Sequence, residues 1–358
     1  MSSLPEKMLA VVNYGPNNYK LETVDCPKPG PLEAIAKVES TGICGSDVHC
    51  CEGAPMFWQG DNPWVKTPVI PGHEFACRVV ALGEGAQEYH GINVGDRVIA
   101  EQILPCGKCK FCKSGKYWMC EVHNMYGYQK DIANGSFAEY IKIYKNAVIH
   151  KIPEEISIED AGFIEPMACA LHVVQRANID FGDVVVLAGA GPLGLGIIQG
   201  IKLKTPKLSI VVDLDDKRLS LAKKLGADMV INPKNEDAVK KVKELTNGYG
   251  CDIYIEATGH PSGVTQGLEM IRKLGRYVQF SVLGKEVTTD WTVIGDRKEL
   301  DIAGSHLGPY CYDSVIDLMR RGLLSAKDIV THKFKLSEYY KAMEVAHSGK
   351  GIKILMIP

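Results

Sequence analysis

The sequence predicts an α/β protein that combines a β-rich part with a doubly wound, parallel sheet. Residues 8–40 alternate apolar and polar side chains between Gly and Pro residues, as short antiparallel strands do. From about Ile158 onward, short apolar runs alternate with helical patterns, which is the βαβ order of a parallel sheet. The chain has 358 residues, a length that suits two domains better than one.

The β-rich part is expected to consist of short strands and irregular loops. Its expected strands lie at 8–15, 19–26, 33–40, 76–85 and 94–103. The segment 113–135 is expected to be a long loop. After Asp301 we expect two helices and a last strand, at 313–324, 337–349 and 352–358.

The second half shows a regular alternation of strand and helix patterns. Its expected strands lie at 184–189, 210–214, 229–232, 252–259 and 276–282. Its expected helices are one that runs through Ile201, followed by 218–227, 237–246 and 265–275. This order predicts a parallel sheet with helices in the crossovers.

A glycine-rich turn organises this second half. The apolar run 184–187 is followed by Gly189, Gly191 and Gly194, a G-x-G-x-x-G spacing, and a helical pattern begins directly after it. Gly189 allows a tight turn, Gly191 lets the backbone approach a pyrophosphate, and Gly194 lets the helix pack close to the strand. A second strand pattern ends at Asp213, about 20 residues further on, and this context favours a dinucleotide site over an unrelated glycine turn.

The residues around the turn also indicate which dinucleotide is bound. Pro192 and Leu193 open the helix, whose free N–H groups and positive dipole end suit phosphates. Asp213 can accept hydrogen bonds from the adenosine ribose, and its carboxylate would repel a 2′-phosphate. The sequence therefore favours NAD over NADP.

Four cysteines form a compact group, Cys106, Cys109, Cys112 and Cys120, with the spacing C-x2-C-x2-C-x7-C. Four thiolates satisfy a tetrahedral Zn2+ and leave no open position, which predicts a structural site. An iron–sulfur cluster is the alternative, although nothing else in the sequence indicates electron transfer.

A second, dispersed set joins a cysteine, a histidine and carboxylates. Its members are Cys44, Ser46, Asp47 and His49 in TGICGSDVH, His73 and Glu74 in PGHEF, and Glu165 in FIEP. Cys, His and a carboxylate can hold a catalytic Zn2+ and leave a position for substrate. Each residue alone also has an ordinary structural interpretation, such as a buried thiol, a turn histidine or a helix-starting acid.

Composition excludes several other classes of protein. The net charge is only −2, and no basic stripe indicates nucleic acid. No apolar run reaches 18 residues, so we expect no membrane span. The N-terminus MSSLPEKM has no apolar signal-peptide region, and the 12 cysteines cluster as metal ligands rather than as a disulfide framework. We therefore expect a cytoplasmic protein.

With these motifs in hand, the sequence resembles the zinc-dependent medium-chain dehydrogenases. GICGSDVH, PGHEF, GDRV, the four-cysteine group and AGAGPLG occur in that family's order and spacing. The chain is most similar to the polyol dehydrogenases, because Glu165 stands where alcohol dehydrogenases carry a third ligand cysteine. PEKM, IPGHEF, EQILPC, GLEMIRKLGRYVQF and SHLGPYC resemble the erythritol and threitol dehydrogenases within that branch.

The resemblance implies a GroES-like catalytic domain and a Rossmann NAD-binding domain, at residues 1–166 with 306–358 and at 167–305. It implies that a catalytic zinc is held by Cys44, His73, Glu165 and Glu74, with Glu74 binding directly or in exchange with water.

Further roles follow from the same resemblance. Ser46 contacts the reacting oxygen and the cofactor, Asp47 orients the ligand histidine, and His49 ends the proton path at the surface. Arg218 lies beside the adenosine ribose.

The expected reaction is oxidation of a secondary alcohol of a small polyol to a ketone, with hydride passing to NAD+ and one catalytic and one structural zinc per chain. Polar partners for the substrate are expected from Glu165, Glu74 and loop residues such as Tyr126 or His306. Phe57, Trp58 and Trp64 either line the substrate pocket or pack in a surface loop.

We expect a homo-oligomer, a dimer or a tetramer. L-threonine or simple alcohol oxidation, and a catalytically silent NAD-binding protein with structural zinc only, remain the alternatives.

Overall fold

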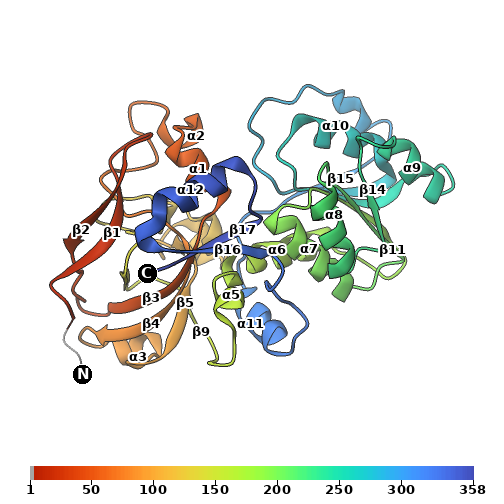
Figure 1. Ribbon diagram of the computed structural model, residues 1–358. Coiled ribbons are helices and arrows are strands. Elements are labelled where there is room, and N and C mark those ends of the chain that lie inside the picture. Colours follow the sequence, from red (N-terminus) through yellow and green to blue (C-terminus); the bar gives the residue numbers. More distant parts are fainter. Residues whose placement is uncertain (1–3) are drawn as a thin grey trace. The chain divides into compact units, whose positions relative to one another are not determined.

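The computed structural model describes residues 4–358, which divide into two compact units (Figure 1). The first unit comprises residues up to Glu165 together with Tyr312–Pro358, and the second comprises Pro166–Cys311. Helix α6 (Ile164–Ala177) contains the boundary near its first turn. Among the described residues, no helix combines the length and apolar character needed to cross a membrane.

The first unit is built mainly from antiparallel strands. Its strands are β1 (Lys7–Asn13), β2 (Tyr19–Asp25), β3 (Ala34–Gly42), β4 (Glu74–Leu82), β5 (Arg97–Ala100), β6 (Ile103–Leu104), β7 (Asn124–Met125), β8 (Tyr140–Ile143), β9 (Ile149–Lys151), β16 (Val330–Lys335) and β17 (Lys353–Ile357). A seven-stranded sheet has the order β16-β17-β3-β4-β5-β9, with β8 also paired to β3. The last strand of the chain therefore lies directly beside β3, where it brings Lys353 to the start of the site described below.

The helices of the first unit are short, apart from α11 and α12. They are α1 (Gly45–Cys51), α2 (Pro55–Trp58), α3 (Ala86–His90), α4 (Lys110–Lys113), η1 (Tyr117–Met119), α5 (Ile158–Ala161), α11 (Tyr312–Arg320), η3 (Leu336–Glu338) and α12 (Tyr339–Ser348). The expected loop 113–135 contains η1 and β7 but is otherwise irregular.

The second unit is a six-stranded, entirely parallel sheet with the order β12-β11-β10-β13-β14-β15. Its strands are β10 (Val184–Ala188), β11 (Leu208–Val212), β12 (Met229–Ile231), β13 (Cys251–Glu256), β14 (Ile271–Gln279) and β15 (Asp301–Gly304). Its remaining helices are α7 (Pro192–Leu203), α8 (Asp216–Leu225), α9 (Ala238–Leu245), α10 (Pro261–Met270) and η2 (Trp291–Val293).

The chain enters this sheet at its centre and then turns to either side, so the strand order reverses between β10 and β13. Helix α7 packs against α8, and α9 packs against α10 (Figure 1). Ligands of such sheets bind at the carboxyl ends of the strands beside the reversal. That position is where the glycine turn lies.

One predicted helix is wrong in its second half. The pattern at 265–275 looks helical, but α10 ends at Met270 and Ile271 begins β14. Ile271 is buried and pairs with Cys251 of β13. Burial in the sheet outweighs the weak helical preference of the segment, as tertiary packing commonly does.

Candidate active site and cofactor site

The turn from β3 into α1 and the start of β4 gather three ligand types at one point. Cys44 is the N-cap of α1, and His73 and Glu74 lie at the beginning of β4. The antiparallel pairing of β3 with β4 sets Gly42 opposite Glu74. One ligand atom from each of Cys44, His73 and Glu74 lies within 4.8 Å of the others. A thiolate, an imidazole and a carboxylate at this spacing fit a Zn2+ ion.

Asp47 holds both the cysteine and the histidine of this group. Its Oδ2 atom accepts a hydrogen bond from the Cys44 N–H at 2.9 Å, and its Oδ1 atom lies 3.6 Å from His73 Nδ1. Burial would lower the pKa of His73, but Asp47 and then Cys44 raise it to about 10. With Nδ1 turned toward Asp47, the other ring nitrogen is left for a metal, which is the usual arrangement of a ligand histidine.

Glu74 is paired with a buried lysine from the other end of the chain. Lys353 forms an ion pair with Glu74 Oε2 and donates to the Ile43 carbonyl at 3.0 Å, and both charged side chains are only 3% exposed. Burial would lower the pKa of Lys353, but the charge of Glu74 raises it above its ordinary value. Gly42 makes room for the pair, since a Cβ there would fall 2.2 Å from Glu74 Oε2.

Glu165 is buried on the first turn of α6 but does not belong to the three-residue group. Its Oε1 atom accepts a hydrogen bond from Gln102, whose own Oε1 accepts from the Tyr312 hydroxyl at 2.7 Å. Its charge nevertheless raises the pKa of both His73 and Lys353, so it lies in the same electrostatic environment.

Ser46 and His49 lie three positions apart on α1, an interval that places side chains on one face of a helix. Ser46 Oγ accepts a hydrogen bond from the Tyr128 hydroxyl at 3.0 Å. His49 is exposed, with its Nδ1 atom 3.5 Å from a Glu52 carboxylate oxygen. The face therefore leads from a half-buried hydroxyl to a solvent-exposed imidazole.

The aromatic residues of the 53–67 loop pack around Tyr128. The Phe57 ring is stacked on it with centroids 5.7 Å apart, and the Trp64 ring lies at 4.7 Å. Trp58 instead donates its indole N–H to the Cys50 carbonyl at 2.7 Å. These contacts make the loop a packed wall behind Tyr128.

Tyr126 and His306 were both suggested as loop partners for the substrate. The suggestion is wrong for Tyr126, and nothing in the structure supports it for His306. Tyr126 is fully buried in the apolar core of the first unit, where its hydroxyl accepts from the Tyr144 N–H at 3.4 Å. His306 is an exposed residue of the second unit. The sequence missed Tyr128, which lies two residues beyond Tyr126.

The four-cysteine group closes on itself as the spacing predicts. Its sulfur atoms lie within 4.8 Å of one another. The backbone N–H of Cys106 points at Cys120 Sγ at 3.3 Å, and that of Cys109 points at Cys106 Sγ at 3.4 Å. Hydrogen bonds from backbone N–H groups, that of Cys112 foremost, lower the pKa of Cys109 to about 6. A closed set of four cysteine sulfur atoms fits a structural Zn2+ ion.

In the second unit, the glycine turn has the form that a pyrophosphate site requires. Gly189 has φ +102°, and a Cβ there would lie 2.6 Å from the Ala257 carbonyl at the end of β13. A Cβ on Gly194 would lie 2.0 Å from the Gly189 carbonyl. At Gly191, by contrast, no protein atom lies within 4 Å of that position. The turn and the packing explain Gly189 and Gly194, whereas Gly191 is explained by a ligand that approaches the backbone.

Asp213 ties this turn to the end of β11. Its Oδ2 atom accepts from the Ala190 N–H at 2.7 Å, and its Oδ1 atom accepts from the Asp215 N–H at 2.9 Å. Pro192 and Leu193 form the first turn of α7, and Arg218 lies in the first turn of α8. A carboxylate offers about four acceptor sites, so Asp213 keeps capacity for ribose hydroxyls.

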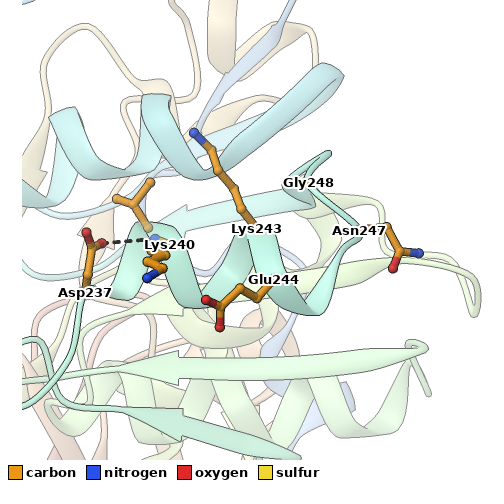
Figure 2. A pocket seen from close by; sticks show the side chains of 7 residues that line it. Asp237, Lys240, Lys243, Glu244, Asn247 and Gly248 are labelled. Carbon is orange, nitrogen blue, oxygen red and sulfur yellow. Dashed lines mark hydrogen bonds between the residues drawn. The ribbon is translucent and has the colours of Figure 1, made fainter.

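A shallow hollow on α9 offers no comparable chemistry. Figure 2 shows that its lining comes mostly from charged side chains of α9 and from Asn247 just beyond it, with the Asp237 carboxylate capping the helix at the Lys240 N–H. None of the seven lining residues is a cysteine or a histidine. We assign it no role.

Known families match both units of the chain. Residues 30–154 match the alcohol dehydrogenase GroES-like domain, and residues 192–321 match the zinc-binding dehydrogenase domain. A solved zinc-binding dehydrogenase from Sinorhizobium meliloti 1021, bound to NADP, superimposes with a TM-score of 0.89 at 28% identity and covers 99% of this chain and 100% of its own. These matches confirm the predicted fold class.

Two relatives of known name are similar over their full lengths. The erythritol/L-threitol dehydrogenase of Mycolicibacterium smegmatis is 49% identical over 360 residues, which covers 100% of this chain and 99% of the relative. The L-threonine 3-dehydrogenase of Pyrococcus horikoshii is 38% identical over 363 residues, with 99% of both covered.

Proposed function

Because the chain belongs to the zinc-binding alcohol dehydrogenase family, and within it is a dehydrogenase of the polyol type, we propose that it oxidises a secondary hydroxyl of a small polyol with NAD+. The observation that carries the proposal is the convergence of Cys44, His73 and Glu74 within 4.8 Å, next to a hydroxyl and a surface histidine on one helix face. In the balanced reaction, the carbinol carbon loses a hydride to the nicotinamide and the hydroxyl loses a proton, which leaves a ketone, NADH and H+.

The side chains of the first unit would bind the metal and move the proton. Cys44, His73 and Glu74 would hold the zinc, with Glu165 as a further ligand or as a partner of the substrate. When bound, Zn2+ supplies the Lewis acidity that makes a hydroxyl easier to deprotonate. Ser46 Oγ would accept the hydroxyl proton, and His49, an exposed imidazole on the same helix face, would deliver it to solvent.

The charges of the site favour a neutral polyol over an amino acid. The buried charged groups described here are three carboxylates, Asp47, Glu74 and Glu165, the ammonium of Lys353 and the imidazole of His73, whose pKa is raised to about 10. Lys353 is already paired with Glu74, and His73 faces Asp47, so the carboxylate of a threonine substrate would meet a set in which both cationic side chains already have an acidic partner. Identity to the erythritol/L-threitol dehydrogenase, which is higher than to the threonine dehydrogenase, agrees with this preference.

The cofactor proposal rests on Asp213 and Gly191. When bound, NAD+ supplies the hydride acceptor. The turn at 189–194 would hold its pyrophosphate, with Pro192 and Leu193 beside it, and Asp213 would accept from the ribose hydroxyls. The NADP-bound relative shows that this fold also accommodates a 2′-phosphate. We propose NAD because a carboxylate, rather than a cation, ends β11, with Arg218 one helical turn further along.

The remaining assignments follow from the same framework. Residues 1–166 with 306–358 would form the catalytic domain and 167–305 the NAD-binding domain. Cys106, Cys109, Cys112 and Cys120 would hold a second, structural zinc. We also propose a cytoplasmic homo-oligomer.

The test is a substrate panel. Erythritol, L-threitol, D-threitol, sorbitol, a simple secondary alcohol and L-threonine are each assayed with NAD+ and with NADP+. We expect the highest kcat/KM with a four-carbon polyol and NAD+. A higher kcat/KM for L-threonine would replace the substrate proposal, and turnover of none of these alcohols would refute the function.

A further inference from the structure

A hydroxyl outside the family motifs makes contact with the proposed proton path. Tyr128 lies between β7 and β8, and its hydroxyl donates to Ser46 Oγ at 3.0 Å. We propose that Tyr128 is a positioning residue, which fixes the direction in which Ser46 presents its own proton. The proposal rests on the proposed function, in which Ser46 takes the proton of the substrate.

The hydrogen-bonding capacity of a serine explains how this works. A serine hydroxyl has one hydrogen to donate and two lone pairs that accept. When Tyr128 donates to one lone pair, the Ser46 hydrogen cannot point toward Tyr128 and must be directed elsewhere. The second lone pair then stays available for an incoming hydroxyl, and donation from Tyr128 makes the Ser46 hydrogen a stronger donor for the relay.

The surroundings hold the tyrosine ring in one place. Tyr128 is only 2% exposed. The Phe57 ring is stacked on it with an interplanar angle of 5°, and the Trp64 ring lies 4.7 Å away, centroid to centroid. Trp64 is itself fixed by a hydrogen bond from its indole N–H to the His123 carbonyl at 3.2 Å. The phenol ring is therefore braced by aromatic neighbours, and its hydroxyl is directed at a fixed point.

His73 is the competing partner of the same hydroxyl. The Tyr128 oxygen lies 3.5 Å from His73 Nδ1, compared with 3.0 Å from Ser46 Oγ. Asp47 also occupies that side of the imidazole, at 3.6 Å. The shorter distance and the donor direction assign Tyr128 to Ser46. If Tyr128 instead acted through His73, removal of its hydroxyl would change the affinity of the site for zinc.

The experiment is a double-mutant cycle in the zinc-loaded, full-length enzyme. Tyr128→Phe removes one oxygen atom and keeps the ring. We expect kcat to fall roughly three- to tenfold, the scale of one hydrogen bond, with zinc affinity and thermal stability near wild type. In a Ser46→Ala background, Tyr128→Phe should change kcat no further, because the group through which it acts is gone.

Tyr126→Phe is the matched control, since it removes the same atom from a core tyrosine two residues away and should leave kcat unchanged. Multiplicative effects of Tyr128→Phe and Ser46→Ala would overturn the inference, and so would an unchanged kcat in Tyr128→Phe. Weakened zinc binding in Tyr128→Phe would also overturn it and assign the residue to His73. If the wild type oxidises no alcohol in the panel, the proposed function fails before this inference is reached.

Discussion

Lys353→Met tests whether the buried ion pair at the metal-ligand group is as important as its burial suggests. Methionine keeps the length of the lysine stem but removes the charge. In the zinc-free protein, the Glu74 carboxylate, 3% exposed, would then lose its buried cationic partner, and the Ile43 carbonyl would lose its donor. Removal of one partner of a buried pair costs about 3–5 kcal/mol, because the other charge remains without compensation.

The expected shift is large enough to measure by thermal or urea unfolding. Each kcal/mol lowers Tm by roughly 2–4 °C for a domain of this size, so the loss is roughly 6–20 °C. The measurement is made on zinc-free protein, because a zinc ion bound at Glu74 would compensate its charge and would itself add to the stability of the folded state. Tryptophan fluorescence is a suitable probe, since Trp58, Trp64 and Trp118 lie in the first unit and only Trp291 lies in the second.

Two comparisons make the result specific. Lys333→Met breaks an ion pair with Glu159 in which the lysine is half exposed, and it should cost about 0–1 kcal/mol. Glu74→Gln combined with Lys353→Met removes both charges and should recover much of the loss. If Lys353→Met destabilises no more than Lys333→Met, our account of the buried pair is wrong.

Three further predictions concern the structural metal, a pH dependence and the cofactor. Cys109→Ala should remove one zinc per chain and lower thermal stability, because a closed thiolate site contributes folding energy; full zinc content at wild-type Tm would contradict this. Burial would lower the pKa of His150, but hydrogen bonds to Glu101 and Asp313 raise it. The charged His150 therefore stabilises the folded protein fully below pH about 6.5, and this contribution is lost as pH rises through the raised pKa. His150→Gln should abolish that part of the decline in urea stability, and an unchanged pH profile would exclude it. Asp213→Ala should weaken NAD+ binding by about 1–3 kcal/mol and shift the kcat/KM ratio toward NADP+, whereas an unchanged ratio would show that Asp213 does not select the cofactor.

Local patterns made the second unit largely predictable. In a parallel sheet, short apolar strand runs alternate with helical patterns, and this alternation is visible in the sequence. Gly189 and Gly194 are required by backbone contacts that only glycine allows. The four-cysteine group was equally predictable, because its four sulfur atoms come from one short segment. The end of α10 was not, since the strand that begins at Ile271 is set by pairing with Cys251, which no local pattern encodes.

The contacts of the first unit are harder to predict from the sequence, because they join segments that lie far apart in the chain. No sequence pattern indicates that Lys353 pairs with Glu74, since the contact depends on β17 lying beside β3. Tyr128 lies in an irregular segment, where neither a helical nor a strand pattern of apolar residues distinguishes it from the core residue Tyr126. Gln102 contacts Glu165 through a side-chain bond between segments that share no motif.

The most direct test of the central claim is Cys44→Ser, assayed for turnover, zinc content and NADH binding in the same preparation. Cys44 lies in the first unit, whereas the glycine turn and Asp213 lie in the second. We predict that turnover of the best polyol is abolished and that one of two zinc ions is lost or weakened, while NADH binds with nearly wild-type affinity. Wild-type turnover by Cys44→Ser would contradict the assignment of the chemistry to the Cys44, His73 and Glu74 group.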